Sequence, residues 1–170
     1  MPKQQLLAAL TEALKADTSA AAHGVRTVVV LGVGSELRSD DAAGLHVAAA
    51  LKAAQVTGVH VLDAGPAPEN CIGEIRRLHP SHLIMVDCAL MGELPGTLKV
   101  FKTSEIAGVS FGTHGLPLNV LADYLQAETG CTAAVLGIEP SSLEFGEVLS
   151  PGVQTAVEEA VRLLREFLSA

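Results

Sequence analysis

Two aspartates and one histidine each lie just past a stretch that has the composition of a buried strand. Asp41 lies in the loop segment GVGSELRSDDAAG, Asp87 follows the apolar run LIMV, and His114 lies in the segment THGLPLN. Two carboxylates and an imidazole can bind a divalent transition-metal ion and leave coordination positions open, whereas a structural zinc site is normally closed and richer in thiolates. The residue types therefore indicate a mixed oxygen and nitrogen cation site.

Each of these residues also has a local structural explanation. Asp40 or Asp41 could cap a helix that begins near Ala42, because an aspartate there accepts backbone hydrogen bonds and suits the helix dipole. Asp87 could close a turn, although an acid that ends an apolar run is costly to bury unless it binds a cation or receives hydrogen bonds. His114 alone could be an exposed side chain without a role. Only the combination of the three favours a site.

The elements that must position these residues follow from the hydrophobic pattern. Leucines at helical spacing predict an amphipathic helix over residues 3–16, which the small-residue linker TSAAAHG joins to the rest of the chain. We expect this helix to lie outside the core. Residues 1–24 are therefore assigned to a helical extension and linker, and residues 25–170 to one α/β domain.

Strands and helices alternate along the second part of the chain. Strands are predicted at residues 27–32, 59–63, 83–87, 98–101 and 132–138, and helices at 43–54, 69–78, 117–128 and 154–168. This alternation is typical of a three-layer α/β/α sandwich around a largely parallel, mixed sheet of about five strands.

In such a sheet, ligands bind beyond the carboxyl ends of the strands. Asp63 and Asp87 are predicted to terminate strands at that edge, and Asp40 and Asp41 to lie in the loop after the first strand of the domain. The predicted topology therefore brings these acidic positions together.

Composition excludes several classes of function. The formal net charge is −8 with 11 basic residues, and the only closely spaced basic residues are Arg76 and Arg77, so nucleic acid is not an expected partner. The sequence contains no run of about 20 apolar residues, the length that is needed to span a bilayer. The N-terminus also lacks the apolar run and cleavage site of a signal peptide, so we expect a cytoplasmic protein without membrane insertion.

The cysteines and glycines argue against other sites. Cys71, Cys88 and Cys131 are odd in number and widely spaced, so we expect reduced core residues rather than a disulfide framework or a zinc knuckle. Gly32 and Gly34 follow a strand, but a dinucleotide-binding fingerprint would need glycine at position 37, where the chain has leucine. The acidic side chains of the same loop would repel a pyrophosphate.

Considered together, the motifs resemble those of the hydrogenase maturation endopeptidases, over about residues 27–168. The family loop G-x-G-N-x-L-x-x-D-[D/E] is matched at residues 32–41, with Ser35 in place of the usual asparagine. The stretches DAGPAPEN at residues 63–70 and THGLPLN at residues 113–119 are most similar to the branch that serves the formate hydrogenlyase type of hydrogenase.

The resemblance implies an endopeptidase that removes a C-terminal extension from the nickel-loaded large-subunit precursor of a [NiFe] hydrogenase. The nickel ligands of the family fall on Asp41, Asp87 and His114, which would also be the catalytic residues of an aspartic-type peptidase. Nickel would be recognised in the precursor and need not be held permanently. Cleavage could use the ion as a Lewis acid or a carboxylate as general base. The alternative is a non-catalytic chaperone that senses nickel without cutting the precursor.

Three further residues are candidates for substrate binding. Asp63 could contact the substrate or support a ligand, although a turn cap beside Gly65 and Pro66 is an equally good explanation. Gly34 and Gly65 would allow the substrate backbone to approach closely.

Overall fold

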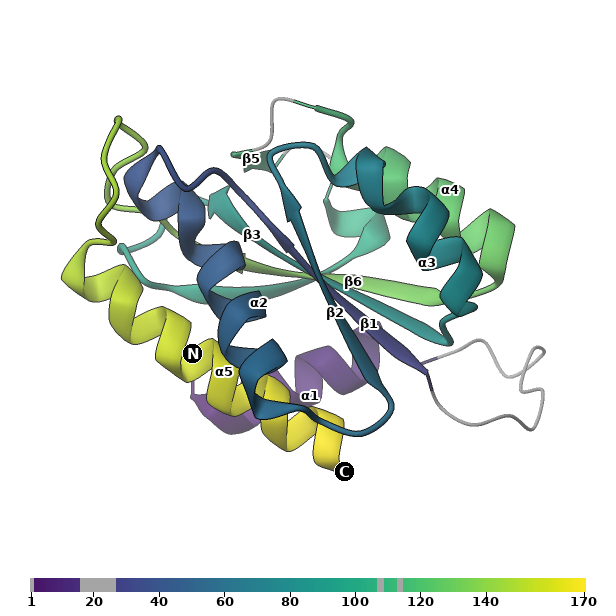
Figure 1. Cartoon of the computed structure of the whole chain (residues 1–170). Coiled ribbons are helices and arrows are strands. Elements are labelled where there is room, and N and C mark those ends of the chain that lie inside the picture. Colours follow the sequence, from purple (N-terminus) through teal and green to yellow (C-terminus); the bar gives the residue numbers. More distant parts are fainter. Residues whose placement is uncertain (1, 16–26, 107–108, 113–114) are drawn as a thin grey trace.

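The computed structural model describes residues 2–15, 27–106, 109–112 and 115–170. Within these residues the chain forms one sheet of six strands covered by five α-helices (Figure 1). The strands are β1 (Val28–Val33), β2 (Val59–Gly65), β3 (His82–Leu90), β4 (Leu98–Lys102), β5 (Ser110–Phe111) and β6 (Thr132–Ile138). The predicted α/β sandwich with a mixed sheet is confirmed.

The sheet is parallel except for the edge strand β4 and the short strand β5. Its strand order is β2-β1-β3-β6-β4, and β5 pairs with the end of β3. Strands β2, β1, β3 and β6 run parallel, whereas β4 is antiparallel to β6 and β5 is antiparallel to β3. The carboxyl ends of the three central strands therefore meet at one edge.

Helices cover both faces of the sheet, which explains the continuous apolar runs in the central strands. One face carries α1 (Lys3–Ala13), α2 (Ala43–Ala54) and α5 (Pro151–Ser169), and the other carries α3 (Ile72–Leu78) and α4 (Leu118–Thr129) (Figure 1). Every residue of β1 is buried, and its side chains alternate between the two hydrophobic cores.

Most predicted elements are present with similar bounds. Helix α2 and strand β6 have the predicted limits, and α5 begins three residues earlier than expected, at Pro151. The predicted helix over residues 69–78 begins with a 3₁₀ turn, Pro68–Cys71, before α3. Strand β5 was not predicted, because two residues are too few to produce a recognisable alternation.

The N-terminal helix α1 is part of the core, so the expectation that it lies outside is wrong. Its residues Leu6, Leu10, Ala13 and Leu14 are buried in the cluster that also contains residues of α2 and α5. The periodicity of the leucines indicated an apolar face, but it contained no information on the surface that this face would cover. The edge strand β4 and helix α5 provide that surface.

In the part of the chain that the structure describes, no helix is both long enough and apolar enough to cross a membrane.

The role of α1 in the core leads to a stability prediction. Replacing the fully buried Leu10 by alanine should lower the free energy of unfolding by about 2–5 kcal/mol, because the core loses buried methyl groups and gains a cavity. Replacing the exposed Gln5 of the same helix should change it by less than about 0.5 kcal/mol. Urea unfolding measures both. Equal, small effects would show that α1 does not contribute to global stability.

Candidate active site at the carboxyl edge of the sheet

Three aspartates lie buried where β1 and β3 approach their carboxyl ends. Asp40 and Asp41 belong to the 3₁₀ turn Ser39–Ala42, which connects the loop after β1 to helix α2. Their exposed fractions are 0% and 3%, and that of Asp87 in β3 is 0%. Gly44 packs so tightly that a β-carbon there would overlap the backbone of Val33 and Val86. The start of α2 therefore lies directly over the two strands.

Asp87 lies inside strand β3, so the prediction that it terminates the strand is wrong. Strand β3 continues to Leu90, because Ala89 and Leu90 pair with β5. The pairing of β1 with β3 stops one residue before Asp87, at Val86, while β6 still pairs with Asp87 through Gly137. The Asp87 carboxylate thus lies at the point where the pairing with the neighbouring strand β1 has ended.

The side chain of Asp87 is only partly satisfied. Its Oδ1 accepts a hydrogen bond of 2.7 Å from the Cys88 N–H, whereas its buried Oδ2 has no hydrogen-bond partner among the described residues. Burial raises the pKa of Asp87 well above its ordinary value, the negative charge of Asp41 raises it further, and the bond from Cys88 opposes this only in part. An aspartate in this environment favours a proton or a cation.

Asp41 faces the segment that leads towards His114. A β-carbon on Gly112 would overlap Asp41 Oδ1, so the carboxylate lies directly against the backbone at Gly112. The Gly112 N–H in turn donates a bond of 3.3 Å to the Cys88 carbonyl, which ties this segment to β3 next to Asp87. His114, the predicted third ligand, lies outside the described residues.

The N-cap residue of α2 is Ala42 rather than Asp40 or Asp41. Instead, the Asp40 carboxylate accepts hydrogen bonds from the backbone N–H groups of Ser141, Ser142 and Ser150 and from the Ser150 hydroxyl, at 2.7–3.0 Å. These donors are more than 100 residues away in sequence. Asp40 therefore fixes the loop between β6 and α5 beside the site.

Glu139 has a similar structural role that the sequence reasoning missed. This buried carboxylate accepts hydrogen bonds from the N–H groups of Met91 (2.8 Å) and Glu93 (3.1 Å), in the turn after β3. Its position after the buried strand β6 is the one signal in the sequence that could have suggested a role at this edge.

Glu69, at the start of the 3₁₀ turn before α3, is a further acid near the site. A β-carbon on Gly115 would lie 2.8 Å from Glu69 Oε2, and this oxygen is buried without a hydrogen-bond partner among the described residues. The Asp41 carboxylate thus adjoins Gly112, and the Glu69 carboxylate adjoins Gly115. These are the described residues on either side of residues 113 and 114.

The predicted substrate-binding residues lie together at the ends of β1 and β2. The Gly34 N–H donates a 3.0 Å bond to the Gly65 carbonyl, and the Gly65 N–H donates one of 3.0 Å to Asp63 Oδ1. Asp63 therefore forms the turn contact that was the alternative explanation, but it also lines a cavity of about 110 Å³. Gly34 has φ +144°, and a β-carbon there would overlap the Asp41 carbonyl, so only glycine fits this position.

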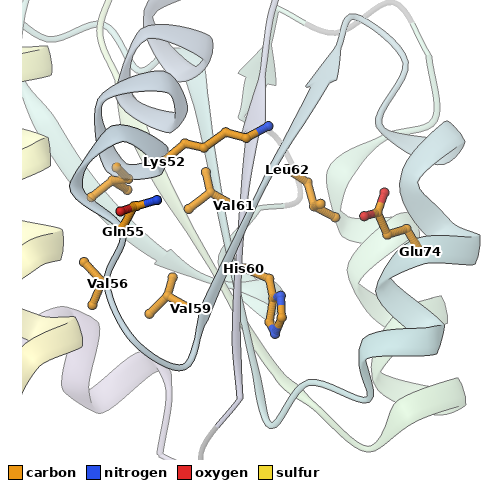
Figure 2. A pocket seen from close by; sticks show the side chains of 9 residues that line it. Lys52, Gln55, Val56, Val59, His60, Val61, Leu62 and Glu74 are labelled. Atoms are coloured by element: carbon orange, nitrogen blue, oxygen red, sulfur yellow. The ribbon is translucent and has the colours of Figure 1, made fainter.

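A larger cavity lies away from these residues. It has a volume of about 390 Å³ and follows the edge strand β2 between α2 and α3 (Figure 2). Lys52, Gln55, His60 and Glu74 are among its lining residues, and none of the predicted site residues lines it. Size alone therefore does not identify the active site.

The structure describes two of the three predicted metal ligands, Asp41 and Asp87. Asp41 and Asp87 are close enough for the charge of one to raise the pKa of the other. Within the described ranges, which exclude His114, no group of three or more histidine, cysteine or acidic side chains is arranged to hold a metal ion. The described part of the site thus contains two carboxylates of the predicted set of three ligands.

These features define an α/β sandwich protein with buried acids at the carboxyl edge of its sheet. Residues 45–166 match the family model described as hydrogenase maturation protease. The hydrogenase 3 maturation protease of Escherichia coli is 37% identical over 81% of this chain and 88% of its own. The hydrogenase 2 maturation protease of Escherichia coli is 30% identical over 79% of this chain and 85% of its own.

Solved structures agree with the sequence comparison. The crystal structure of the [NiFe] hydrogenase maturation protease HycI from Thermococcus kodakarensis superimposes with a TM-score of 0.78, at 30% identity, covering 87% of this chain and 96% of that chain. The chain therefore belongs to the hydrogenase maturation protease family. It is a peptidase that acts in hydrogenase maturation, as the resemblance implied.

The contact between Asp41 and Gly112 predicts a selective loss of activity. A Gly112→Ala variant should displace the Asp41 carboxylate and lower precursor cleavage at least about 10-fold, since small misplacements of catalytic groups cost up to 100-fold. The matched control is Gly73→Ala in α3, where a β-carbon meets no atom within 4 Å. Cleavage assays and melting temperatures are measured for both. Full activity in Gly112→Ala would contradict this view of Asp41.

The environment of Asp87 predicts an unusual dependence of stability on pH. Because its pKa is raised in the folded state, its favourable contribution is complete below the unfolded pKa of about 3.9 and is lost as pH rises through the folded pKa. At neutral pH, Asp87→Asn should therefore be more stable than the metal-free parent by about 1–3 kcal/mol, and this difference should vanish near pH 4.

Urea unfolding from pH 4 to pH 8 measures that difference. The exposed Asp123 of α4 provides the control, because Asp123→Asn should leave the profile of the parent unchanged. Parallel profiles for the parent and Asp87→Asn would mean that Asp87 titrates normally.

Proposed function

We propose that this peptidase removes the C-terminal extension of a nickel-loaded large-subunit precursor of a [NiFe] hydrogenase. The observation that carries the proposal is the buried pair Asp41 and Asp87 at the carboxyl edge of the sheet. An unsatisfied buried oxygen on Asp87 is the property expected of a site that completes itself with a cation from outside. Membership of the maturation protease family supports this class of substrate.

We assign recognition of the nickel ion to Asp41, Asp87 and His114. Carboxylate and imidazole ligands suit this ion, and three protein ligands leave positions for groups of the precursor. His114 follows Gly112 by two residues, a length of chain that spans at most about 7 Å. Because the backbone at Gly112 adjoins the Asp41 carboxylate, the covalent connection supports the inclusion of His114.

The same residues would perform the hydrolysis, and the ion is part of the substrate. The buried Oδ2 of Asp87 has no hydrogen-bond partner among the described residues, so it is free to accept a proton from a water molecule, and Asp87 is suited to act as general base. This would be aspartic-type chemistry. Polarisation of the scissile carbonyl by the nickel ion is the alternative route and uses the same ligands.

Substrate contacts are assigned to Gly34, Gly65 and Asp63, which lie beside the Asp41 turn. The Gly34 N–H donates to the Gly65 carbonyl, and the Gly65 N–H donates to the Asp63 side chain. We also propose that the protein acts in the cytoplasm, where the free thiols of its three cysteines would stay reduced.

The test is incubation of the purified protein with hydrogenase large-subunit precursors, with and without nickel, followed by mass spectrometry of the precursor. We expect loss of a C-terminal peptide from the nickel-loaded form alone. Binding of that form without shortening would instead identify a nickel-sensing chaperone. Cleavage that is independent of nickel would contradict the proposed role of the ion.

Variants of the three ligands complete the test. Alanine at Asp41, Asp87 or His114 should lower the cleavage rate by about 100-fold or more. Alanine at the exposed Asp123 or His60 provides controls of matching residue type, with melting temperatures to verify folding. Full activity in all three ligand variants would exclude this site.

A further inference from the structure

Two loops beside the site are joined into one rigid unit. Residues 37–40, after β1, and residues 141–146, after β6, form a short parallel bridge at Arg38 and Gly146. Backbone bonds connect Ser39 N to the Gly146 carbonyl (2.7 Å) and Gly146 N to the Leu37 carbonyl (3.0 Å). The buried Asp40 carboxylate accepts hydrogen bonds from backbone N–H groups of the second loop and so connects it to the first.

Large apolar side chains are exposed in this unit and two residues beyond it, at Val148. We name Leu37, Phe145 and Val148 the loop patch; their exposed fractions are 62%, 86% and 79%. The Arg38 guanidinium lies 5.7 Å from the centre of the Phe145 ring and supports it from one side. Exposed side chains of this kind on a fixed backbone are typical of an interaction site, because little conformational entropy is lost on binding.

The distribution of exposed apolar side chains on the described surface favours the same edge. Seven large hydrophobic residues are exposed there, and five of them lie in segments at the carboxyl edge: Leu37, Leu90, Leu94, Phe145 and Val148. The other two, Val120 and Tyr124, lie on α4. Scattered exposed residues need no explanation, but this gathering around the buried acids does.

An acidic groove continues from the loop patch. It consists of two adjoining cavities of about 250 and 110 Å³, which share the residues Glu36 and His46. Leu37 and Glu147 line the larger cavity, and Asp63 lines the smaller one. No lysine or arginine is among the described residues that line either cavity. The groove therefore suits a basic side chain next to an apolar segment.

We propose that the loop patch and the acidic groove form the docking surface for the hydrogenase precursor, binding an apolar segment of it that carries at least one lysine or arginine. The inference rests on the proposed function, because it assigns this surface to the substrate of that site. Leu37 lies four residues before Asp41 in the same loop, a length of chain that spans at most about 14 Å, so a precursor bound at Asp41 can also contact the patch. Apolar contacts would supply affinity and the carboxylates would select the basic segment.

The first experiment measures kcat and KM for the nickel-loaded precursor with a variant that carries Leu37→Ser, Phe145→Ser and Val148→Ser. We expect KM to rise at least 10-fold and kcat at saturation to stay within twofold, because the patch touches no reacting atom. The matched control is Val120→Ser on α4, which should change neither value. All four side chains are exposed, so the variants should fold.

The second experiment tests the groove. The double variant Glu36→Gln and Glu147→Gln should raise KM at least threefold and weaken its dependence on ionic strength. The control pair Glu158→Gln and Glu159→Gln on α5 removes the same charge and should leave the salt dependence of the parent intact.

The outcomes separate the docking surface from the proposed function. If the parent protein cleaves the precursor and the patch variant has an unchanged KM, the docking surface is wrong and the function stands. A parent that cleaves no precursor overturns both. Sedimentation compares the oligomeric state of the parent and of the patch variant. If the parent is a dimer and the variant a monomer, with precursor binding unchanged, then the patch binds a second copy of this chain instead.

Discussion

The burial of four carboxylates at one edge of the sheet is the constraint on which the rest of the site depends. Asp40 and Glu139 are compensated by backbone N–H groups of neighbouring loops, so their negative charge orders the chain around them. Asp87 receives one such bond and keeps one buried oxygen without a partner among the described residues. Compensated acids therefore build the frame, and the incompletely compensated acid is available for chemistry.

The neighbouring residues Asp40 and Asp41 divide these tasks. A 3₁₀ turn points consecutive side chains in different directions, so one carboxylate reaches the loop between β6 and α5 while the other meets Gly112. Because both lie on the same turn, a change in that loop would be transmitted to Asp41 through the backbone of two residues. The sequence Asp-Asp thus connects the proposed catalytic acid with the loop between β6 and α5.

Much of this arrangement was predictable from local pattern. Buried strands and amphipathic helices have characteristic periods, and the rule that ligands bind at the carboxyl ends of parallel strands brought Asp41 and Asp87 together. The hydrogen-bond partners of Asp40 were not predictable, because they lie more than 100 residues away and belong to a loop without a periodic pattern. A similar reason applies to Asp87: its strand extends beyond it because Cys88 pairs with β6 and because Ala89 and Leu90 pair with β5, which is too short to be recognised in the sequence.

Buried acids are costly for the folded protein, and under the proposed function this cost has a consequence for the choice of substrate. The charges of Asp41 and Asp87 raise the free energy of the folded state unless a proton or a cation neutralises them. A divalent ion delivered by a precursor would replace that proton and receive the full attraction of both carboxylates in a poorly hydrated environment. A precursor without the ion would leave the repulsion between Asp41 and Asp87 in place, so its binding would gain nothing from these two charges. Under the proposed function, the charge of the site would therefore discriminate between the two precursors without a movement of the fold.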